Sequence, residues 1–247
     1  MLFSDPPGGT DDYGPYEFNE VDGIVYYVDA GDGGPELWRT DGTSAGTSEV
    51  KDIRPGPLGS YISNVYTANS LLFFIADGTE DDRLYRSDGT EAGTWPVADI
   101  WPGPVEDSVE QQAVLGNLLL FAANDGVHGV ELWRTNGGPS GTHMVQDILP
   151  GPSGSRPNTI YPLHGTDRAV FVASDGVHGM ELWSTDGTAA GTRQLCDIAP
   201  GLDSAASEDG TFIEAPGRLY FVANDGTTGR ELWAIPTRPP GAVPVET

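Results

Sequence analysis

The chain has 247 residues and a formal net charge of −25, from 37 acidic and 12 basic residues. A surface of that sign repels phosphate groups, which argues against a nucleic-acid partner and against anionic membranes. No apolar run approaches the roughly 18 residues of a membrane-spanning helix, so we expect no membrane insertion. The length fits one all-β domain, and the single cysteine, Cys196, excludes an internal disulfide bond.

A twelve-residue segment recurs along the chain. It reads ELWRTDGTSAGT at residues 36–47, RLYRSDGTEAGT at 83–94, ELWRTNGGPSGT at 131–142 and ELWSTDGTAAGT at 181–192. A fifth copy begins at Glu231 and stops after ELWAIPT. Repetition at a nearly fixed period indicates a repeat architecture.

A second motif, D-I-x-P-G, follows each complete copy. Its aspartates are Asp52, Asp99, Asp147 and Asp197. No such motif follows Trp233, but a related segment, LFSDPPGGT with Asp5, lies at the N-terminus, so the spacings are 47, 47, 48 and 50 residues. The chain therefore holds five units, and one of them is divided between the two ends of the chain.

Turns rich in glycine and aspartate divide each unit into four short segments, which in the fourth unit are residues 159–163, 169–173, 180–185 and 193–198. Segments of this length between such turns indicate the strands of an antiparallel meander. The second segment is apolar almost throughout, which indicates burial on both faces. Five four-stranded units predict an all-β fold, a five-bladed β-propeller of four-stranded antiparallel blades.

The divided unit predicts how the ring closes. Residues 2–5 would add the outer strand to the last blade, beside the strand that contains Glu231. A solenoid is less favoured, because it predicts atypical caps at both ends. We expect one domain over residues 1–235, with units at about 6–52, 53–99, 100–147, 148–197 and 198–235 plus 1–5, and a proline-rich tail or linker at 236–247.

The segment ELWSTDGTAAGT with its following D-I-x-P-G motif resembles the bacterial ELWxxDGT repeat family. The resemblance runs from Leu2 to about Trp233 and implies a secreted or surface-attached repeat protein. The second copy departs from the pattern at Arg83 and Tyr85, and the third has Asn136-Gly137-Gly138 in place of Asp-Gly-Thr. The family supplies no catalytic residues. The sequence begins without a signal peptide, and we expect a trimmed segment of a secreted or cell-surface protein.

Two recurrent positions are expected to serve structure. A large aromatic residue in the third strand should pack between blades; these residues are Trp38, Tyr85, Trp133, Trp183 and Trp233. The residue that opens each D-G-T turn should accept hydrogen bonds from the N–H groups of the turn; these residues are Asp41, Asp88, Asn136 and Asp186.

The aspartates of the D-I-x-P-G motif are also expected to be structural. Asp52, Asp99, Asp147 and Asp197 should accept N–H groups of the Pro-Gly loop or pair with an arginine of the neighbouring blade. Calcium is the alternative, but it needs about six to eight oxygen ligands, and one aspartate per unit does not supply them.

The loop between the second and third strands is the candidate ligand site. It reads NDGVHGVE from Asn124, SDGVHGME from Ser174 and NDGTTGRE from Asn224. Binding sites of such folds lie on loops that rigid blades carry. The candidate ligand-binding residues are Asp125, His128, Asp175, His178 and Asp225. The two histidines would lie on neighbouring blades, too far apart to share one zinc ion.

These observations favour non-catalytic extracellular recognition, with repeated rim-loop sites that bind glycans multivalently. The alternative is a structural adhesion or scaffold module without a small ligand. An enzyme with a metal in the central channel is less favoured, because the first strands offer mainly Glu17, Gln112 and Glu214 and no histidine. No cofactor is required, Ca²⁺ is the one ion considered, the partner is a glycan or a surface protein, and the chain is expected to be a monomer.

Overall fold

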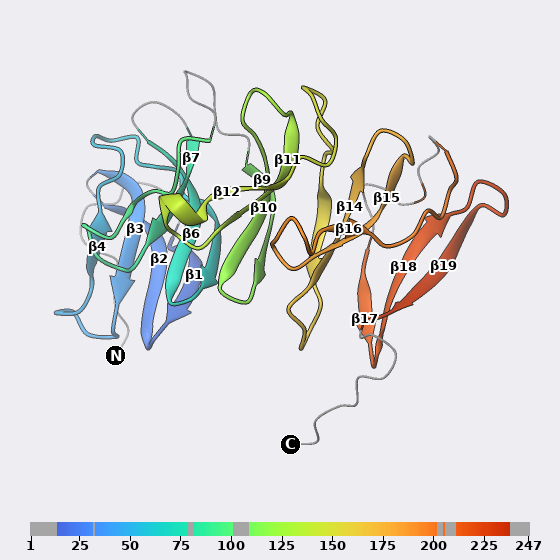
Figure 1. Cartoon of the computed structure of the whole chain (residues 1–247). Helices are drawn as coiled ribbons and strands as arrows, with labels where there is room; N and C mark the ends of the chain where they lie inside the picture. Colours follow the sequence, from blue (N-terminus) through green and yellow to red (C-terminus); the bar gives the residue numbers. More distant parts are fainter. Residues whose placement is uncertain are drawn as a thin grey trace. The chain divides into compact units, whose positions relative to one another are not determined.

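The computed structural model describes residues 14–31, 33–78, 82–100, 109–201, 205 and 211–237 (Figure 1). In these ranges the only helix is a 3₁₀ turn, η1 (Pro139–Gly141), and no helix is long and apolar enough to cross a membrane. The strands form four four-stranded sheets and one three-stranded sheet. The all-β prediction is confirmed. The expected closing strand at residues 2–5 and the tail beyond Thr237 lie outside the described residues.

The chain divides into two compact units. Unit 1 comprises residues 1–109, 116–119 and 135–143, and unit 2 comprises 110–115, 120–134 and 144–247. The first sheet contains β1 (Tyr16–Val21), β2 (Ile24–Gly31), β3 (Gly34–Thr40) and β4 (Ser48–Lys51). The second contains β5 (Ser63–Ala68), β6 (Leu71–Asp77), β7 (Asp82–Ser87) and β8 (Trp95–Pro96). Both belong to unit 1.

The third sheet, through which the division passes, contains β9 (Val109–Leu115), β10 (Leu118–Asn124), β11 (Val130–Thr135) and β12 (His143–Gln146). Unit 2 also holds the fourth sheet, with β13 (Asn158–Pro162), β14 (Ala169–Ser174), β15 (Met180–Thr185) and β16 (Arg193–Gln194), and the fifth, with β17 (Ile213–Ala215), β18 (Arg218–Asn224) and β19 (Arg230–Pro236). Strands adjacent in the sequence are adjacent in every sheet.

Three hydrophobic clusters lie between neighbouring sheets: one between the first and second sheets, one between the third and fourth, and one between the fourth and fifth. In unit 1, Leu37 of the first sheet packs in one cluster with Phe74 and Tyr85 of the second. In unit 2, Trp183 of the fourth sheet packs in a cluster with Leu132 of the third. Leu37 and Leu132 therefore face the sheet that follows their own, whereas Tyr85 and Trp183 face the sheet that precedes theirs.

The aromatic residues of the third strands, which were expected to pack between blades, are buried to different degrees. Tyr85 and Trp183 are 8% and 7% exposed, and the indole Nε1 of Trp183 donates to the Ala173 carbonyl at 3.1 Å. Trp233 is half-buried against the cluster between the fourth and fifth sheets. Trp38 and Trp133 are also half-buried, and their Nε1 atoms have no hydrogen-bond partner among the described residues.

The fifth sheet differs from the other four. Its strand β18 was expected to be buried on both faces, but this prediction is wrong because Val222 is 36% exposed. Leu232 is 70% exposed, although its counterparts Leu37, Leu84, Leu132 and Leu182 are at most 1% exposed. Among the described residues no fourth strand lies beside β19. One apolar face of this sheet is therefore uncovered in this part of the structure.

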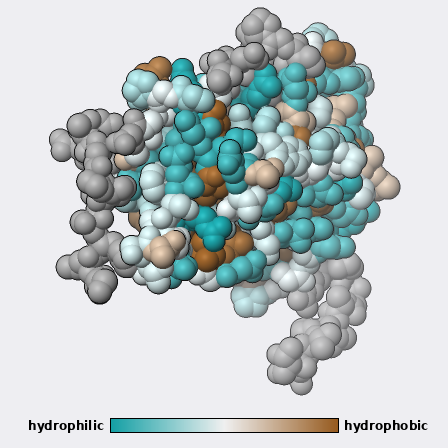
Figure 2. All heavy atoms as spheres, turned by 90° about the vertical axis from the view of Figure 1, so that its left-hand side faces the viewer, coloured by the Kyte–Doolittle hydropathy of each residue, from teal (hydrophilic) through white to brown (hydrophobic). Residues whose placement is uncertain are grey.

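The face of the molecule that Figure 2 shows is mainly polar. Figure 2 looks at the side on which the first sheet lies, and its described surface is mostly hydrophilic, with small hydrophobic patches. Such a surface agrees with the strongly acidic composition.

Candidate functional site

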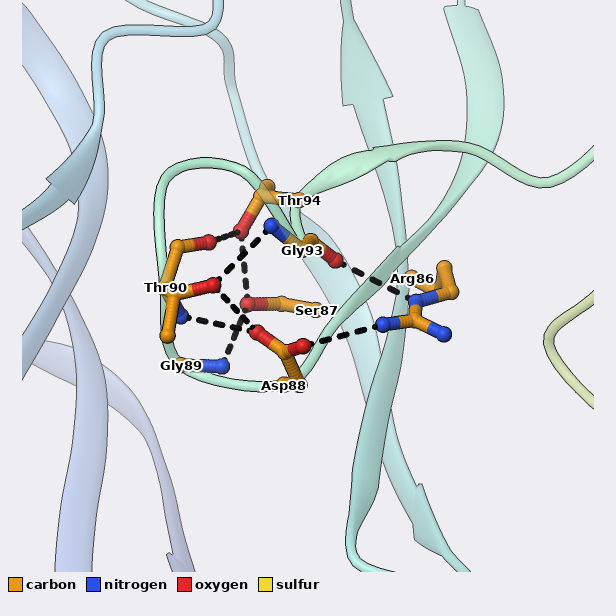
Figure 3. A network of polar contacts seen from close by, with 7 residues as sticks. All are labelled: Arg86, Ser87, Asp88, Gly89, Thr90, Gly93 and Thr94. Carbon is orange, nitrogen blue, oxygen red and sulfur yellow. Dashed lines mark hydrogen bonds and ion pairs between the residues drawn. The ribbon is translucent and has the colours of Figure 1, made fainter.

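In the first four repeats the third strand ends in a D-G-T turn, or N-G-G in the third repeat, that closes on itself; Figure 3 shows the turn of the second repeat. Asp88 Oδ1 accepts the N–H of Thr90 at 3.0 Å and its hydroxyl at 2.7 Å. These hydrogen bonds, the hydroxyl of Thr90 first, lower the pKa of Asp88. Asp41 and Asp186 make the same two bonds, to Thr43 and Thr188. Asn136 Oδ1 accepts the Gly138 N–H at 3.0 Å, so the predicted role of these turn residues is confirmed.

The same turn explains three further residues of the repeat. The hydroxyl groups of Ser87 and Thr94 lie 2.7 Å apart and join the two sides of the turn (Figure 3). A Cβ atom on Gly93 would lie 1.9 Å from Asp88 Oδ1, so only glycine leaves room for the carboxylate. The turn is a self-contained scaffold, and its carboxylate is already bonded.

The opposite end of the third strand carries a buried glutamate that the sequence analysis did not identify. Glu36 accepts the N–H groups of Ile53 and Arg54 at 3.1 and 3.3 Å. Glu131 accepts Leu149 N–H at 3.0 Å and Ser155 N–H at 2.9 Å, and Glu181 accepts Ile198 and Ala199 N–H at 3.0 and 3.2 Å. We call this contact between the glutamate and the D-I-x-P-G loop the glutamate clamp.

The clamped loop also joins consecutive sheets through its backbone. Ser60 N–H donates to Pro35 of β3 at 2.9 Å, and the Ser60 carbonyl accepts Asp77 N–H of β6 at 2.7 Å. Ser155 and Ala205 occupy the same place in unit 2: their carbonyls accept the N–H groups of Ser174 and Asn224 at 3.0 and 2.9 Å. The loop therefore connects the third strand of one repeat to the second strand of the next.

Burial raises the pKa values of the clamp glutamates. Removal from water raises the pKa of Glu36 to about 7, against the opposing effect of its hydrogen bonds to Ser60, Ile53 and Arg54. Burial also raises the pKa values of Glu131 and Glu181. The fifth copy supplies a comparison: Glu231 is exposed, and no D-I-x-P-G motif follows it in the chain.

The clamp corrects the expected role of the motif aspartates. The loop N–H groups bond to the glutamates, so Asp52, Asp147 and Asp197 do not accept them. Asp52 and Asp197 are exposed, and the described residues make no hydrogen bond or ion pair with them. Asp147 Oδ1 is buried and has no hydrogen-bond partner in the described structure. Asp99 is exposed, and the loop that follows Ile100 is not described.

The candidate ligand residues lie on three hairpin tips of unit 2, residues 124–129, 174–179 and 224–229. Asp125 Oδ1 accepts the N–H groups of Val127 and His128 at 2.9 and 2.8 Å, and its Oδ2 lies 2.7 Å from His128 Nδ1. In the second tip, Asp175 makes the same three contacts at 2.8, 2.9 and 2.7 Å. In the third tip, Asp225 Oδ1 accepts the N–H groups of Thr227 and Thr228.

These contacts hold each tip in one conformation. In the two tips that contain a histidine, they leave the Nε2 edge of the imidazole unbonded. The Asp125 side chain raises the pKa of His128 by hydrogen bonding, and Asp147 and Glu131 add to this effect by their charge. His178 has the same relation to Asp175, and Asp197 and Glu181 raise its pKa further. The histidine side chains are 37% and 38% exposed, and no described residue bonds to either Nε2 atom.

The structure brings each histidine together with the aspartate of its own loop, but it does not combine the two pairs in one site. Among the described residues no group of three or more His, Cys, Asp or Glu side chains could hold a metal ion. Three of the lone pairs of Asp125 are already occupied, so its carboxylate fits a calcium shell poorly. Of the residues considered for a central channel, Glu214 bonds to His164 Nδ1 at 2.9 Å.

No protein-family model and no curated protein sequence matches the chain. Similar solved structures include a puromycin hydrolase, which is 14% identical with a TM-score of 0.52 over 94% of this chain and 38% of its own. An oligogalacturonate lyase in complex with manganese is 15% identical with a TM-score of 0.51, over 92% of this chain and 64% of its own.

A puromycin-hydrolyzing peptidase of Mycobacterium tuberculosis is 12% identical with a TM-score of 0.50, over 90% of this chain and 36% of its own. This chain thus spans well under half the length of the two hydrolases it matches. At such identities the likeness concerns the fold alone. It shows that the chain has a β-propeller-like all-β fold.

Proposed function

We propose that the chain is a five-bladed, closed β-propeller of a secreted or surface repeat protein of the ELWxxDGT type, and that it recognises ligands without catalysis. The uncovered face and edge of the fifth sheet support closure. Leu232 is 70% exposed where its four counterparts are buried, and β19 has no outer neighbour among the described residues. An apolar face and an open edge of this kind need a partner.

Residues 2–5 are the proposed outer strand of the fifth sheet. Deleting residues 1–5 should therefore lower the melting temperature and promote self-association, because an open edge invites pairing. Deleting the tail from residue 238 is the matched control and should change neither property. A deletion of residues 1–5 that melts and sediments like the parent protein would contradict closure by this strand.

The recognition function rests on the three hairpin tips of unit 2. They repeat one conformation on consecutive sheets, with a carboxylate that fixes two backbone N–H groups in each. Preorganised loops lose little conformational entropy on binding. Several equivalent weak sites on one body gain affinity for a repeating ligand through effective concentration. A glycan polymer is such a ligand, and we propose a glycan as the partner.

A glycan array with and without calcium tests this function. We expect oligosaccharides to bind with an affinity that increases with their chain length. The double variant H128A/H178A should bind them more weakly. The turn variant D186N, at the other end of a hairpin, should bind like the parent protein. If no glycan binds in either condition, the recognition function fails, and a structural adhesion or scaffold module without a small ligand is the better account.

A further inference from the structure

The turn of the third repeat contains the only asparagine–glycine pair in the sequence, Asn136-Gly137. The other complete repeats have Asp41, Asp88 and Asp186 at the position of Asn136. Asparagine before glycine is chemically labile, because the backbone nitrogen of the next residue can attack the side-chain carbonyl and glycine has no Cβ atom that hinders the approach. The pair is therefore a candidate for covalent modification.

The reaction needs only the chain itself and water. The nitrogen of Gly137 bonds to Cγ of Asn136, the C–N bond of the side-chain amide breaks, and ammonia leaves with the proton that the Gly137 nitrogen gives up. The product is a cyclic imide. Water then opens the ring. Cleavage at Cγ gives aspartate, whereas cleavage at the main-chain carbonyl carbon gives isoaspartate, in which the backbone runs through the side chain.

The aspartate product suits the turn. Asn136 Oδ1 accepts the N–H of Gly138 at 3.0 Å, and in the second repeat Asp88 Oδ1 accepts the equivalent N–H of Thr90 at 3.0 Å (Figure 3). A carboxylate oxygen can therefore replace the amide oxygen. The isoaspartate product does not suit it, because a Cβ atom on Gly141 would lie only 1.9 Å from Asn136 Oδ1, and so close a fit leaves no room for a rerouted backbone.

The folded turn restrains both reacting groups. Asn136 is exposed, but Gly137 is buried and its N–H donates to Thr135 Oγ1 at 2.9 Å. The Thr135 hydroxyl is itself fixed, 2.7 Å from that of Thr142, and the side-chain oxygen of Asn136 is held by the Gly138 N–H. A buried, hydrogen-bonded N–H loses its proton slowly until the segment opens. The attacking nitrogen is therefore blocked while the turn is closed.

We infer that Asn136 is a deamidation site whose reaction is held back by the folded turn and takes place when the turn opens. The aspartate product converts the N-G-G turn into D-G-G, adds one negative charge and keeps the fold. The inference depends neither on glycan recognition nor on ring closure, since all its contacts lie within residues 135–142.

Incubation in mildly alkaline buffer, followed by mass spectrometry of the peptide that contains residue 136, tests the inference. The native protein should lose the amide at least about tenfold more slowly than the protein unfolded in urea. The variant T135V removes the acceptor of the Gly137 N–H and should raise the native rate by about tenfold, with no change in urea. No deamidation in urea, or equal rates in the native and unfolded protein, would overturn the inference.

The matched control is T185V in the fourth repeat. Thr185 Oγ1 accepts the Gly187 N–H at 2.9 Å and lies 2.7 Å from Thr192 Oγ1, so this variant loses the same contacts in a turn without asparagine. It should leave the rate at Asn136 unchanged. Equal acceleration by T135V and T185V would show that the reaction follows global unfolding and would overturn local protection. The variant N136D should melt like the parent, and a clear fall in its melting temperature would contradict the fit of the aspartate product.

Discussion

The two ends of strand β15 hold the fourth sheet in opposite ways. At its C-terminal end, Asp186 bonds to Thr188, two residues away, and the turn is complete within itself. At its N-terminal end, Glu181 bonds to Ile198 and Ala199, 17 and 18 residues away, and the clamped loop continues to the next sheet. The first contact shapes one hairpin, whereas the second joins one repeat to the next.

The two contacts should therefore contribute differently to stability. Asp186 is half-buried, but its hydrogen bonds to Thr188 lie at an exposed turn, so they exchange with water at little net cost. Glu181 is fully buried, so the loss of its carboxylate leaves buried N–H groups without an acceptor. Damage to the clamp should therefore cost much more than damage to the turn.

The largest effect is expected for Glu181→Ala. It removes the acceptor of two buried N–H groups and should lower the free energy of unfolding by about 3–5 kcal/mol. Urea denaturation followed by tryptophan fluorescence measures this change. Glu91→Ala is the matched control, because Glu91 is exposed in a turn, and it should cost less than about 0.5 kcal/mol. Equal costs at the two positions would contradict the clamp.

The clamp also predicts a pH dependence. The folded-state pKa of Glu36 is about 7, above its ordinary value of 4.5, so the folded protein holds this proton over that interval and unfolding releases it. The contribution of Glu36 to stability is therefore present below pH 4.5 and is lost as the pH rises to about 7. The melting temperature should fall across this window by this effect.

Glu36→Gln removes that titration and should flatten the profile between pH 4.5 and 7. The histidines of unit 2 titrate with raised pKa values in both proteins, so they cancel in the difference between variant and parent. Asp41→Asn is the control, since hydrogen bonds lower the pKa of Asp41 and its contribution is lost only in more acidic solution. A profile for Glu36→Gln that is parallel to the parent would show that Glu36 is ionised throughout.

The contrast between turn and clamp also explains what could be predicted from the sequence. Strands, hairpin turns and the role of Asp186 follow from short-range patterns, because each signal and its partner lie within a few residues. Glu181 was missed because its partners are backbone N–H groups, which no side chain identifies. The constant separation of about 17 residues between the glutamate and the Ile of D-I-x-P-G was the available signal. The sequence prediction made Asp197 the acceptor of the loop N–H groups. It therefore could not anticipate that Asp197 is exposed and that Glu181 accepts these groups instead.

Asp186→Ala should have a smaller effect than loss of the clamp. It removes two hydrogen bonds of an exposed turn and should cost about 1 kcal/mol in urea denaturation. The contacts between sheets should remain, so amide hydrogen exchange should increase at the turn and not at the clamped loop. Increased exchange at Ile198 and Ala199 would mean that the two ends of β15 are coupled.

The smallest effect is expected for Asp186→Asn. Asn136 already holds the equivalent turn with its side-chain oxygen 3.0 Å from Gly138 N, so the turn needs an acceptor and no charge. The change in the free energy of unfolding at neutral pH should stay within about 0.5 kcal/mol. A difference should appear only in acid. The hydroxyl of Thr188, first among its contacts, lowers the pKa of Asp186 below 3.8, so the contribution of the carboxylate is present above 3.8 and lost as the pH falls through the folded-state value. The amide does not titrate, and the variant should lose less stability than the parent in that range. A cost above about 1 kcal/mol at pH 7 would instead show that the turn depends on its charge.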